Sequence, residues 1–251
     1  MKKLAIAAVA ALALIATGAN AQSIRIGTEG AYEPWNYVDE NGNLAGLDID
    51  VMNELCKRAG LECTFVQTAW DTIIPNLNAG NYDVIAAGMS ITEERQQSIN
   101  FTADYSPPDE SAYMMLASSN VDPSNLKGVK IGTQTGTIQD GYANENLAEG
   151  NTLLTFDTAS NALADLMAGN IDVILADSSY VDEAVANSGG ALKTSDVTVA
   201  IGGGVGAGLR KADTELLAKL DEALAAAKAD GTIDALITKH FPTRKGPFYL
   251  K

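Results

Sequence analysis

Histidine and cysteine are scarce in this sequence, and acidic residues outnumber basic ones. The 251 residues include one His and two Cys, too few for a structural zinc site or a multi-His metal centre. A Ser-His-Asp triad would have to use His240, in a Lys- and Phe-rich C-terminal stretch. With 17 Lys and Arg against 32 Asp and Glu, the net charge of −15 argues against binding to nucleic acid or to an anionic membrane. The length fits one large domain or two smaller lobes.

Long apolar runs are also missing, apart from one at the N-terminus. Residues 1–21 combine a positive start (Lys2 and Lys3), an apolar run over 4–16 and a small-x-small sequence at 19–21. This pattern is typical of a cleaved secretory signal peptide. A membrane anchor is the alternative, but the run is shorter than the roughly 20 residues that span a bilayer. We therefore expect export to an oxidising compartment, most simply the periplasm, without lipid attachment, since no Cys lies at the predicted cleavage site.

The two cysteines, Cys56 and Cys63, are seven positions apart. In an exported protein, a disulfide between them is the default expectation. It would join the end of a predicted helix (51–59) to the following predicted strand (62–67), and closing so short a loop contributes about 2–3 kcal/mol in the chain-entropy model. A metal pair or a redox CxxC motif would need a different number or spacing of cysteines.

Two segments of the chain nearly repeat each other. Residues 78–87 (NAGNYDVIAA) resemble residues 167–176 (MAGNIDVILA), and each is typical of a helix end, a glycine C-cap, a turn and a short apolar strand. The tripeptide Ile-Gly-Thr also occurs twice, at 26–28 and 131–133. Strands that alternate with helices indicate mainly parallel sheets. The sequence therefore predicts an α/β fold with two similar lobes.

Two stretches are expected to connect these lobes. The chain near 105–111, which contains two consecutive prolines, is interpreted as the first crossing. A glycine-rich stretch, 201–208, is interpreted as a strand that returns across a hinge and leads to a final helix over 213–229. As a phosphate-binding loop this stretch lacks the Lys-Ser/Thr ending. The predicted boundaries are 22–106 and 206–251 for lobe 1, 112–200 for lobe 2, and 107–111 and 201–205 for the crossings.

Polar and aromatic side chains follow four of the predicted strands. Ligands bind outside the carboxyl ends of the strands in open α/β sheets, so two lobes with facing strand ends would enclose a cleft lined by these residues. They are Glu29, Tyr32 and Trp35 after the first strand, Ser90, Thr92 and Arg95 after the first Asp-Val-Ile strand, Gln134, Thr137 and Gln139 after the second Ile-Gly-Thr strand, and Asp177 after the second Asp-Val-Ile strand.

The charged members of this set suit a ligand with a carboxylate and amino groups. Arg95 is expected in the first turn of a helix, where the helix dipole disfavours a cation, and its guanidinium could hold a carboxylate. A surface ion pair with Glu93 or Glu94 is the alternative. Asp177 could hold an ammonium group or could simply cap the next helix. With Glu29 as a second acid, one Arg facing two acids matches a zwitterion with one extra positive charge.

Aromatic residues make up only 6% of the chain, and two of them are candidates for packing against a ligand. Tyr32 and Trp70 could enclose an alkyl chain or a guanidinium by stacking and cation–π contact. Trp70 could equally be an ordinary core residue. Trp35 follows a proline in a turn and is interpreted as structural.

Five segments, in order along the chain, resemble the periplasmic amino-acid-binding proteins of ABC importers, which form solute-binding protein family 3. They are 26–36 (IGTEGAYEPWN), 46–50 (GLDID), 54–58 (ELCKR), 89–95 (MSITEER) and 206–211 (GAGLRK). The lysine/arginine/ornithine- and histidine-binding group is the most similar, and opine-binding members are similar across 28–36. The resemblance implies the type II periplasmic binding protein fold, a clamp of two α/β lobes joined by two hinge strands.

The resemblance also implies a role for each candidate site residue. By matching position, Arg95 would bind the α-carboxylate and Asp177 the α-ammonium group, with further hydrogen bonds from Ser90 and Thr137. Glu29 would bind the side-chain amine of a cationic ligand. The cysteine pair matches the disulfide of the basic-amino-acid group. The remaining positions are Tyr32 and Trp70 for stacking, Gln134 for side-chain choice, and Gly88, which ends an Ala-Ala-Gly segment where some members have serines.

We therefore expect a monomeric receptor, not an enzyme, that captures an arginine-, lysine- or ornithine-type L-amino acid and delivers it to a membrane ABC permease without a metal or cofactor. An opine is an alternative ligand, although Asp177 favours a free α-amino group. A dehydratase on the same fold would need a proton donor, for which Glu29 is the candidate, and a strongly raised carboxyl pKa in the cleft would favour it. A sensor ectodomain would need a transmembrane or signalling segment, and we expect none after Lys251.

Overall fold

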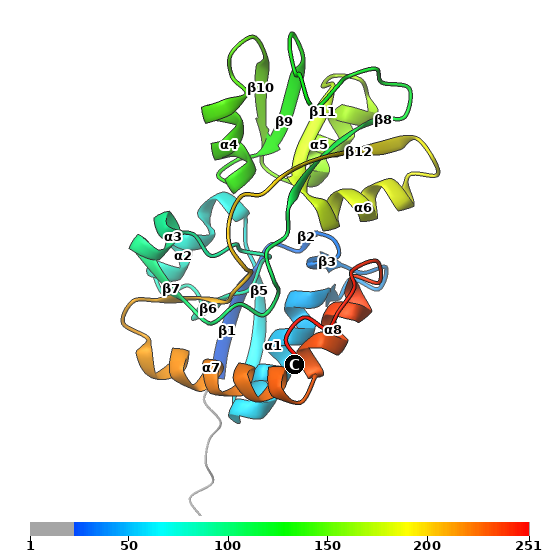
Figure 1. Cartoon of the computed structure of the whole chain (residues 1–251). Helices are drawn as coiled ribbons and strands as arrows, with labels where there is room; N and C mark the ends of the chain where they lie inside the picture. The colour runs from blue at the N-terminus through cyan, green and yellow to red at the C-terminus, as the bar shows by residue number, and fades with distance from the viewer. Residues whose placement is uncertain (1–22, 251) are drawn as a thin grey trace, which may run out of the picture.

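Two five-stranded sheets form two lobes, one above the other in Figure 1, in the computed structural model, which describes residues 23–250. This confirms the predicted two-lobed α/β fold, while the predicted signal peptide lies outside the described residues. The first sheet consists, in spatial order, of β5 (Glu62–Gln67), β1 (Ser23–Thr28), β6 (Val84–Ile85), β13 (Gly208–Arg210) and β7 (Ile99–Phe101). The second consists of β10 (Thr152–Phe156), β9 (Lys130–Gln134), β11 (Val173–Asp177), β8 (Ser111–Leu116) and β12 (Leu192–Val199).

The two sheets share one plan. In the first, β1 pairs in parallel with β5 and β6, while β13 runs antiparallel between β6 and β7. In the second, β9 pairs in parallel with β10 and β11, while β8 runs antiparallel between β11 and β12. The antiparallel strand of each sheet is the first strand that the chain forms there after crossing from the other lobe. The predicted mainly parallel sheets are therefore confirmed, with one reversed strand each.

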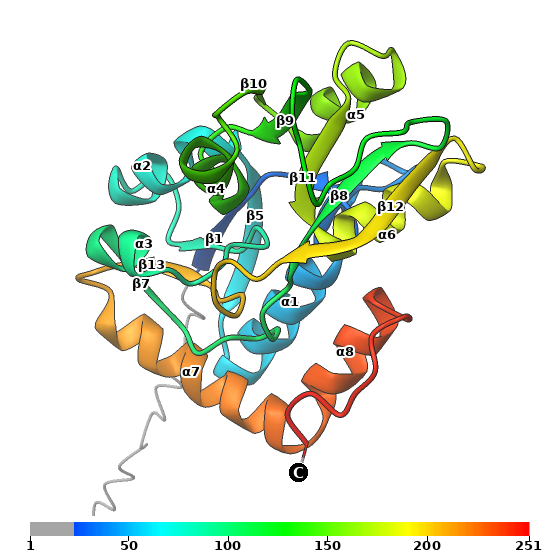
Figure 2. The same cartoon turned by 45° about the horizontal axis from the view of Figure 1, so that its top comes forward.

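Helices cover both faces of each sheet. In the first lobe, α1 (Leu47–Ala59), α7 (Thr214–Ala229) and α8 (Thr232–His240) pack on one face, and η1 (Trp70–Thr72) with α2 (Ile73–Asn78) packs on the other (Figures 1 and 2). The short α3 (Glu93–Ser98) precedes β7. In the second lobe, α5 (Ala159–Met167) and α6 (Ser178–Asn187) lie on one face and α4 (Ile138–Asn146) on the other. Within residues 23–250, none of these helices has the length and apolarity to cross a membrane.

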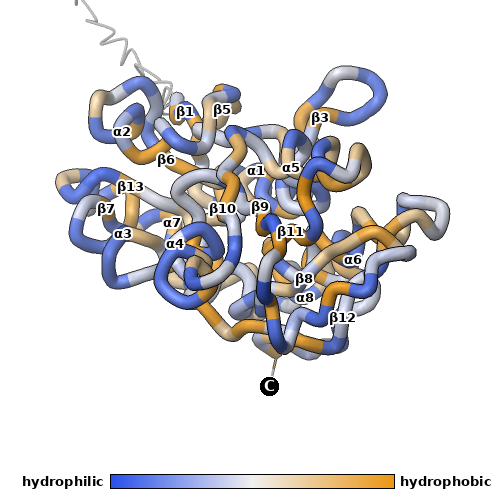
Figure 3. Tube along the Cα trace, turned by 90° about the horizontal axis from the view of Figure 1, so that it is seen from above, coloured by the Kyte–Doolittle hydropathy of each residue, from blue (hydrophilic) through white to orange (hydrophobic). Residues whose placement is uncertain are grey.

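The apolar core follows the alternation of the strands. Ile24 and Ile26 of β1 point towards α1 and α7, whereas Ile85 of β6 points to the opposite face and packs with Leu77 of α2. Viewed from above, apolar residues concentrate along β9 and β11 at the centre of the second sheet (Figure 3). A small sheet of β2 (Ala31–Tyr32), β3 (Asn36–Val38) and β4 (Leu44–Ala45) lies between β1 and α1 in the chain.

The predicted disulfide is confirmed. Cys56 in the last turns of α1 is bonded to Cys63 in β5, with a Cα–Cα distance of 6.2 Å. Between them, Gly60 ends α1 in a left-handed conformation (φ 67°), and its N–H donates to the carbonyls of Cys56 and Lys57. The disulfide therefore fixes the tight turn that leads from helix to strand.

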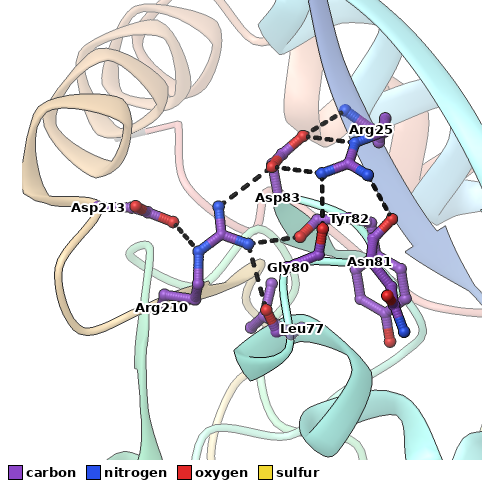
Figure 4. A network of polar contacts seen from close by, with 8 residues as sticks. All are labelled: Arg25, Leu77, Gly80, Asn81, Tyr82, Asp83, Arg210 and Asp213. Carbon is purple, nitrogen blue, oxygen red and sulfur yellow. Dashed lines mark hydrogen bonds and ion pairs between the residues drawn. The ribbon is translucent and has the colours of Figure 1, made fainter.

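The repeated Gly-Asn-x-Asp segments have the same structural role in both lobes. The Asp83 carboxylate accepts a hydrogen bond from the Arg25 backbone N–H (3.0 Å), and the Asp83 N–H donates to the Arg25 carbonyl (2.8 Å). Asp172 forms the same pair with Lys130, at 2.7 and 2.9 Å. In the first lobe, the guanidinium groups of Arg25 and Arg210 both form ion pairs with Asp83 (Figure 4). The repeated aspartate thus ties the turn before one strand to the neighbouring strand.

The repeated Ile-Gly-Thr tripeptide also has a packing reason. A Cβ on Gly27 would lie 2.5 Å from the Tyr82 ring, and one on Gly132 would lie 2.5 Å from Ile171 Cδ1. Both large residues belong to the Gly-Asn-x-Asp segments of their own lobes. Glycine in the strand therefore makes room for the large residue of the turn.

Two expectations about the C-terminal part differ from the structure. The predicted final helix over 213–229 is α7, but Gly231 (φ 82°) then starts a further helix, α8. The stretch 201–207 is not a continuous strand, since only Val205 forms isolated bridges, to Ser90 and Ser106. A Cβ on Gly203 would lie 2.7 Å from the Ile91 carbonyl oxygen, so close backbone approach requires glycine there.

Candidate functional site

A cavity is lined by residues of both lobes. All nine ligand-binding candidates lie in its wall, although two other residues from the predicted strand ends do not: Thr92 caps α3, and Trp35 is buried beside the cavity. The first lobe contributes Glu29 after β1, Tyr32 in β2, Trp70 in η1, Gly88 and Ser90 after β6, and Arg95 in α3; the second contributes Gln134 at the end of β9, Thr137 before α4 and Asp177 at the end of β11, with Ala87, Ile138 and Gln139 completing the wall.

Arg95 lies in the first turn of α3, as predicted, and its side chain spans the two lobes. Its backbone N–H donates to the Thr92 hydroxyl, and its guanidinium donates to the carbonyls of Ser90 (3.0 Å) and, in the other lobe, Gly136 (3.5 Å). Among residues 23–250, Arg95 forms no ion pair, so the alternative of a surface pair with a neighbouring glutamate is not observed. Burial lowers the pKa of Arg95 to about 10, which leaves it charged at neutral pH.

Asp177 stands at the N-cap position of α6, but its side chain makes no capping hydrogen bond. Instead, its carboxylate accepts hydrogen bonds from the Tyr32 hydroxyl across the lobes (2.9 Å) and from the Gln139 amide (2.8 Å). Burial raises the pKa of Asp177, and the negative charge of Asp109 adds to the shift. An ionised carboxylate has about four acceptor positions, so Asp177 retains capacity for a further donor.

Glu29 and Gln134 meet across the cavity. The Gln134 amide nitrogen donates to Glu29 Oε1 (2.7 Å) and to the Asp157 carbonyl (3.1 Å), which fixes the amide orientation. Burial raises the pKa of Glu29 to about 7, and the Gln134 hydrogen bond opposes this shift only in part. Glu29 therefore lacks a cationic partner of its own in the described structure.

Tyr32 and Trp70 both line the cavity, and one face of each ring packs against a protein group. The Tyr32 ring stacks on Tyr180, with 4.6 Å between centroids and 4° between planes. The Arg95 guanidinium lies 5.2 Å from the centroid of the Trp70 ring, and Trp70 is also buried in an apolar cluster with Ile73. Trp70 therefore belongs to the core and to the cavity wall. Packing against a ligand would have to use the opposite ring faces.

Asp48 is a residue of this region that the sequence reasoning did not single out. It is fully buried in α1 and accepts hydrogen bonds from the Tyr105 hydroxyl (2.5 Å), the Asn36 amide (2.8 Å) and the Gly88 N–H (2.7 Å). Burial raises the pKa of Asp48 to about 6 despite these three bonds. Asp48 therefore holds the Gly88 loop against α1. Its position inside the GLDID segment, one of the five segments that carry the family resemblance, could have identified it from the sequence.

A second missed feature joins the lobes beside the cavity. The Trp35 indole N–H donates to the Ser179 hydroxyl (2.8 Å), and this hydroxyl donates to the Asp109 carboxylate (2.5 Å). Arg244 forms an ion pair with the same carboxylate. Trp35 is structural, as expected, but it also connects the first lobe to the start of α6, only two residues after Asp177.

Residues 24–243 match the bacterial extracellular solute-binding proteins, family 3. The chain belongs to this family. The histidine-binding periplasmic protein of Salmonella typhimurium is 38% identical to this solute-binding protein over 259 residues, covering 96% of this chain and 97% of that protein. The ABC transporter arginine-binding protein 1 of Escherichia coli is 36% identical and covers 96% of this chain and 100% of its own length.

A solved structure extends the likeness to the fold. The periplasmic His/Glu/Gln/Arg/opine family-binding protein of Silicibacter pomeroyi, in complex with lysine, is 44% identical and covers 90% of this chain and 100% of that chain, with a TM-score of 0.82. The resemblance predicted from five segments is therefore confirmed. The two sheets of this solute-binding protein are the two lobes of the periplasmic binding protein fold.

Proposed function

We propose that this solute-binding protein is an exported periplasmic receptor that binds a cationic L-amino acid and delivers it to a membrane ABC permease. The charge of the cavity wall supports this proposal: the wall contains one arginine, Arg95, and two carboxyl groups, Glu29 and Asp177. An α-carboxylate, an α-ammonium group and a side-chain cation would match these three in number and sign. Relatives that bind arginine, histidine or lysine are consistent with this ligand class.

Each proposed pair follows from the surroundings of the protein group. The Arg95 fork would hold the α-carboxylate, with hydrogen bonds from Ser90 and Thr137, and Asp177 would hold the α-ammonium group. Glu29 would hold the distal cation, because its buried carboxylate has an amide but, among residues 23–250, no cation beside it. Tyr32, Trp70, Gly88 and Gln134 would form the wall around the ligand side chain.

The same proposal covers the movement of the lobes. Residues 22–106 and 206–251 would move as one lobe and 112–200 as the other, bending at 107–111 and 201–205 and closing on the ligand. We propose that the protein acts as a monomer, that residues 1–21 direct export and are removed, and that the ligand is released unchanged to the permease.

The raised pKa of Glu29 favours a second candidate, a dehydratase that protonates a leaving hydroxyl of a cyclic acid. A carboxyl with a pKa of about 7 is half protonated at neutral pH and could act as a general acid. The two candidates differ in turnover. Loss of water from a cyclic hydroxy acid, detected by absorbance, would establish the enzyme, while unchanged ligand recovered from the protein supports the receptor.

Replacing Glu29 by Gln is expected to weaken arginine and lysine selectively. Thermal unfolding of the refolded mature protein should show a shift of about 8–16 °C with a micromolar ligand at millimolar concentration, since saturation then contributes about 4 kcal/mol. In Glu29→Gln the shift with arginine should largely disappear, because a buried cation loses its partner. Glutamine, which carries no distal charge, serves as the comparison ligand.

Glu33→Gln is the matched control, since it removes the same charge from the turn that follows β2, outside the cavity wall. Equal arginine affinity in the wild type and Glu29→Gln would contradict the assignment of Glu29 to the distal cation. If only opines raised the unfolding temperature of the wild type, the ligand would be an opine, while the proposal that two lobes close on it would stand.

Affinity for arginine is expected to fall as the pH drops below about 7. Burial raises the pKa of Glu29 to about 7, and pairing with a cation would lower it, so the carboxyl must release a proton on binding below that pH. The affinity is therefore fully present above pH 7 and declines by up to about tenfold per pH unit for this group. Titrations from pH 5 to 8 measure the slope, and Glu29→Gln should be flatter. A pH-independent affinity in the wild type would contradict the pairing.

A further inference from the structure

Asn36 is a fully buried polar residue at the start of β3, and both ends of its side-chain amide are hydrogen-bonded. The side-chain oxygen of Asn36 accepts from the Gly30 backbone N–H (2.7 Å), and its amide nitrogen donates to the Asp48 carboxylate (2.8 Å). Glu29 directly precedes Gly30 and lines the cavity. Asn36 therefore links a buried carboxylate of α1 to the peptide bond that follows Glu29, the proposed partner of the distal cation.

The orientation of the Asn36 amide cannot be reversed without the loss of both hydrogen bonds. A backbone N–H only donates and an ionised carboxylate only accepts, so Asn36 must present its oxygen to Gly30 and its nitrogen to Asp48. The Asp48 carboxylate is itself held in place by the Gly88 N–H (2.7 Å) and the Tyr105 hydroxyl (2.5 Å). Asp48 thus determines that Asn36 offers an acceptor to Gly30.

The hydrogen bond from Asn36 acts on the backbone directly beside Glu29. A peptide group is planar, so holding the Gly30 N–H fixes the direction in which the chain leaves Glu29. Gly30 is in the left-handed conformation (φ 77°), and glycine restricts the backbone less than any other residue type. Removal of the Asn36 bond would therefore allow the backbone at Glu29 to move, and the Glu29 carboxylate would move with it.

We propose that Asn36 is a positioning residue for ligand selectivity, which holds the Glu29 carboxylate where it pairs with the distal cation of the ligand. This inference rests on the proposed function and adds a residue that lies outside the cavity wall. The α-carboxylate and the α-ammonium group would bind Arg95 and Asp177, which belong to other segments. Loss of the Asn36 bond should thus weaken cationic ligands and affect neutral ones little.

Replacing Asn36 by Ala should lower the affinity for arginine about 10- to 100-fold, as measured by isothermal titration, and should change the affinity for glutamine much less. The expected loss is smaller than that for a missing partner of a buried charge pair, because Glu29 is displaced but not removed. In a Glu29→Gln background, Asn36→Ala should cause no further loss of arginine affinity, since the carboxylate that Asn36 positions is then absent.

Tyr105→Phe is the matched control. It removes another buried hydrogen bond to the same Asp48 carboxylate, but not the one that continues to Gly30. A purely structural role of these bonds would lower the unfolding temperature in both variants and leave the ratio of arginine to glutamine affinity unchanged in both. We expect the unfolding temperature to fall in both variants and the affinity ratio to fall only in Asn36→Ala.

Hydrogen exchange of the backbone amides, followed by NMR, tests the same link in the wild type and does not depend on the folding of a variant. Pairing of Glu29 with a cation should stabilise the ordered loop, so the Gly30 N–H should exchange more slowly with saturating arginine than with saturating glutamine. The Gly88 N–H, which donates to the same carboxylate from another loop of the cavity, is the internal reference for the stability of each complex.

Three results would overturn the role of Asn36: equal losses of arginine and glutamine affinity in Asn36→Ala, a similar further loss of arginine affinity in the Glu29→Gln background, or equal protection of Gly30 relative to Gly88 with both ligands. The Glu29→Gln variant separates this inference from the proposed function. If Glu29→Gln weakens arginine and Asn36→Ala does not, only the role of Asn36 fails. If Glu29→Gln binds arginine as the wild type does, the proposed pairing itself fails, and the role of Asn36 with it.

Discussion

Replacing Arg95 by Ala is expected to abolish tight binding of every amino acid, whatever its side chain. All L-amino acids carry the α-carboxylate that Arg95 would hold, and closure of the lobes removes that carboxylate from water. Leaving one partner of a buried charge pair alone costs about 2–5 kcal/mol, or about 30- to 5,000-fold in affinity. Isothermal titration with arginine, lysine and glutamine measures the loss, which should be similar for the three.

Two comparisons separate the charge of Arg95 from its shape. Arg95→Lys keeps a cation but not the planar fork, so it should recover only part of the affinity. Agmatine, which is arginine without its carboxylate, should bind Arg95→Ala and the wild type about equally. A loss confined to one amino acid would show that Arg95 recognises the side chain and not the α-carboxylate.

The effect on folding should be small. Arg95 lies in the short helix α3, whose residues are all partly or fully exposed, and within residues 23–250 its guanidinium donates only to two carbonyls. The unfolding temperature of ligand-free Arg95→Ala should therefore stay near that of the wild type, and a large decrease would mean that the loss of binding reflects damage to the lobe.

The two-lobed fold and the membership of the cavity wall were predictable because both follow from local patterns. The repeated segment around Asp83 and Asp172 marks the start of a strand in each lobe, because the aspartate forms the same hydrogen bond to the backbone of the neighbouring strand in both. Once two such sheets are inferred, the rule that ligands bind at strand ends places Glu29, Gln134 and Asp177 at one cleft. This step does not require knowledge of any contact between two residues that are far apart in the sequence.

Contacts between segments that are far apart in the sequence could not be predicted in the same way. Trp35 and Ser179 are 144 positions apart, and nothing in the local sequence around either residue indicates that they form a hydrogen bond. The glycines at 201–208 indicated flexibility, but at Gly203 and Gly206 the structural reason is the close approach of Ile91, which belongs to another loop. The Tyr180 hydroxyl, which has no hydrogen-bond partner among residues 23–250, is likewise a property of the packed structure alone.

The second large loss is expected for Asp177→Asn. Asp177 is the carboxylate proposed to hold the α-ammonium group, and its two present donors, Tyr32 and Gln139, leave acceptor positions free. Asparagine has the same shape but no charge, and its amide NH₂ would face one of the two existing donors. Arginine, lysine and glutamine should all bind about 30- to 5,000-fold more weakly, as measured by isothermal titration.

Although Asp177→Asn should bind amino acids more weakly, its folding stability should not decrease. Because burial raises the pKa of Asp177 above that of an unfolded chain, ionisation of this carboxyl at neutral pH disfavours the folded state, and a neutral asparagine removes that cost. Ligand-free Asp177→Asn should therefore be at least as stable as the wild type at pH 7 or above, with the difference vanishing in acid.

5-Guanidinovaleric acid, which is arginine without its α-amino group, should bind the wild type and Asp177→Asn alike. If its affinity fell as far as that of arginine, Asp177 would be shaping the cavity through Tyr32 and Gln139 and not binding the ammonium group.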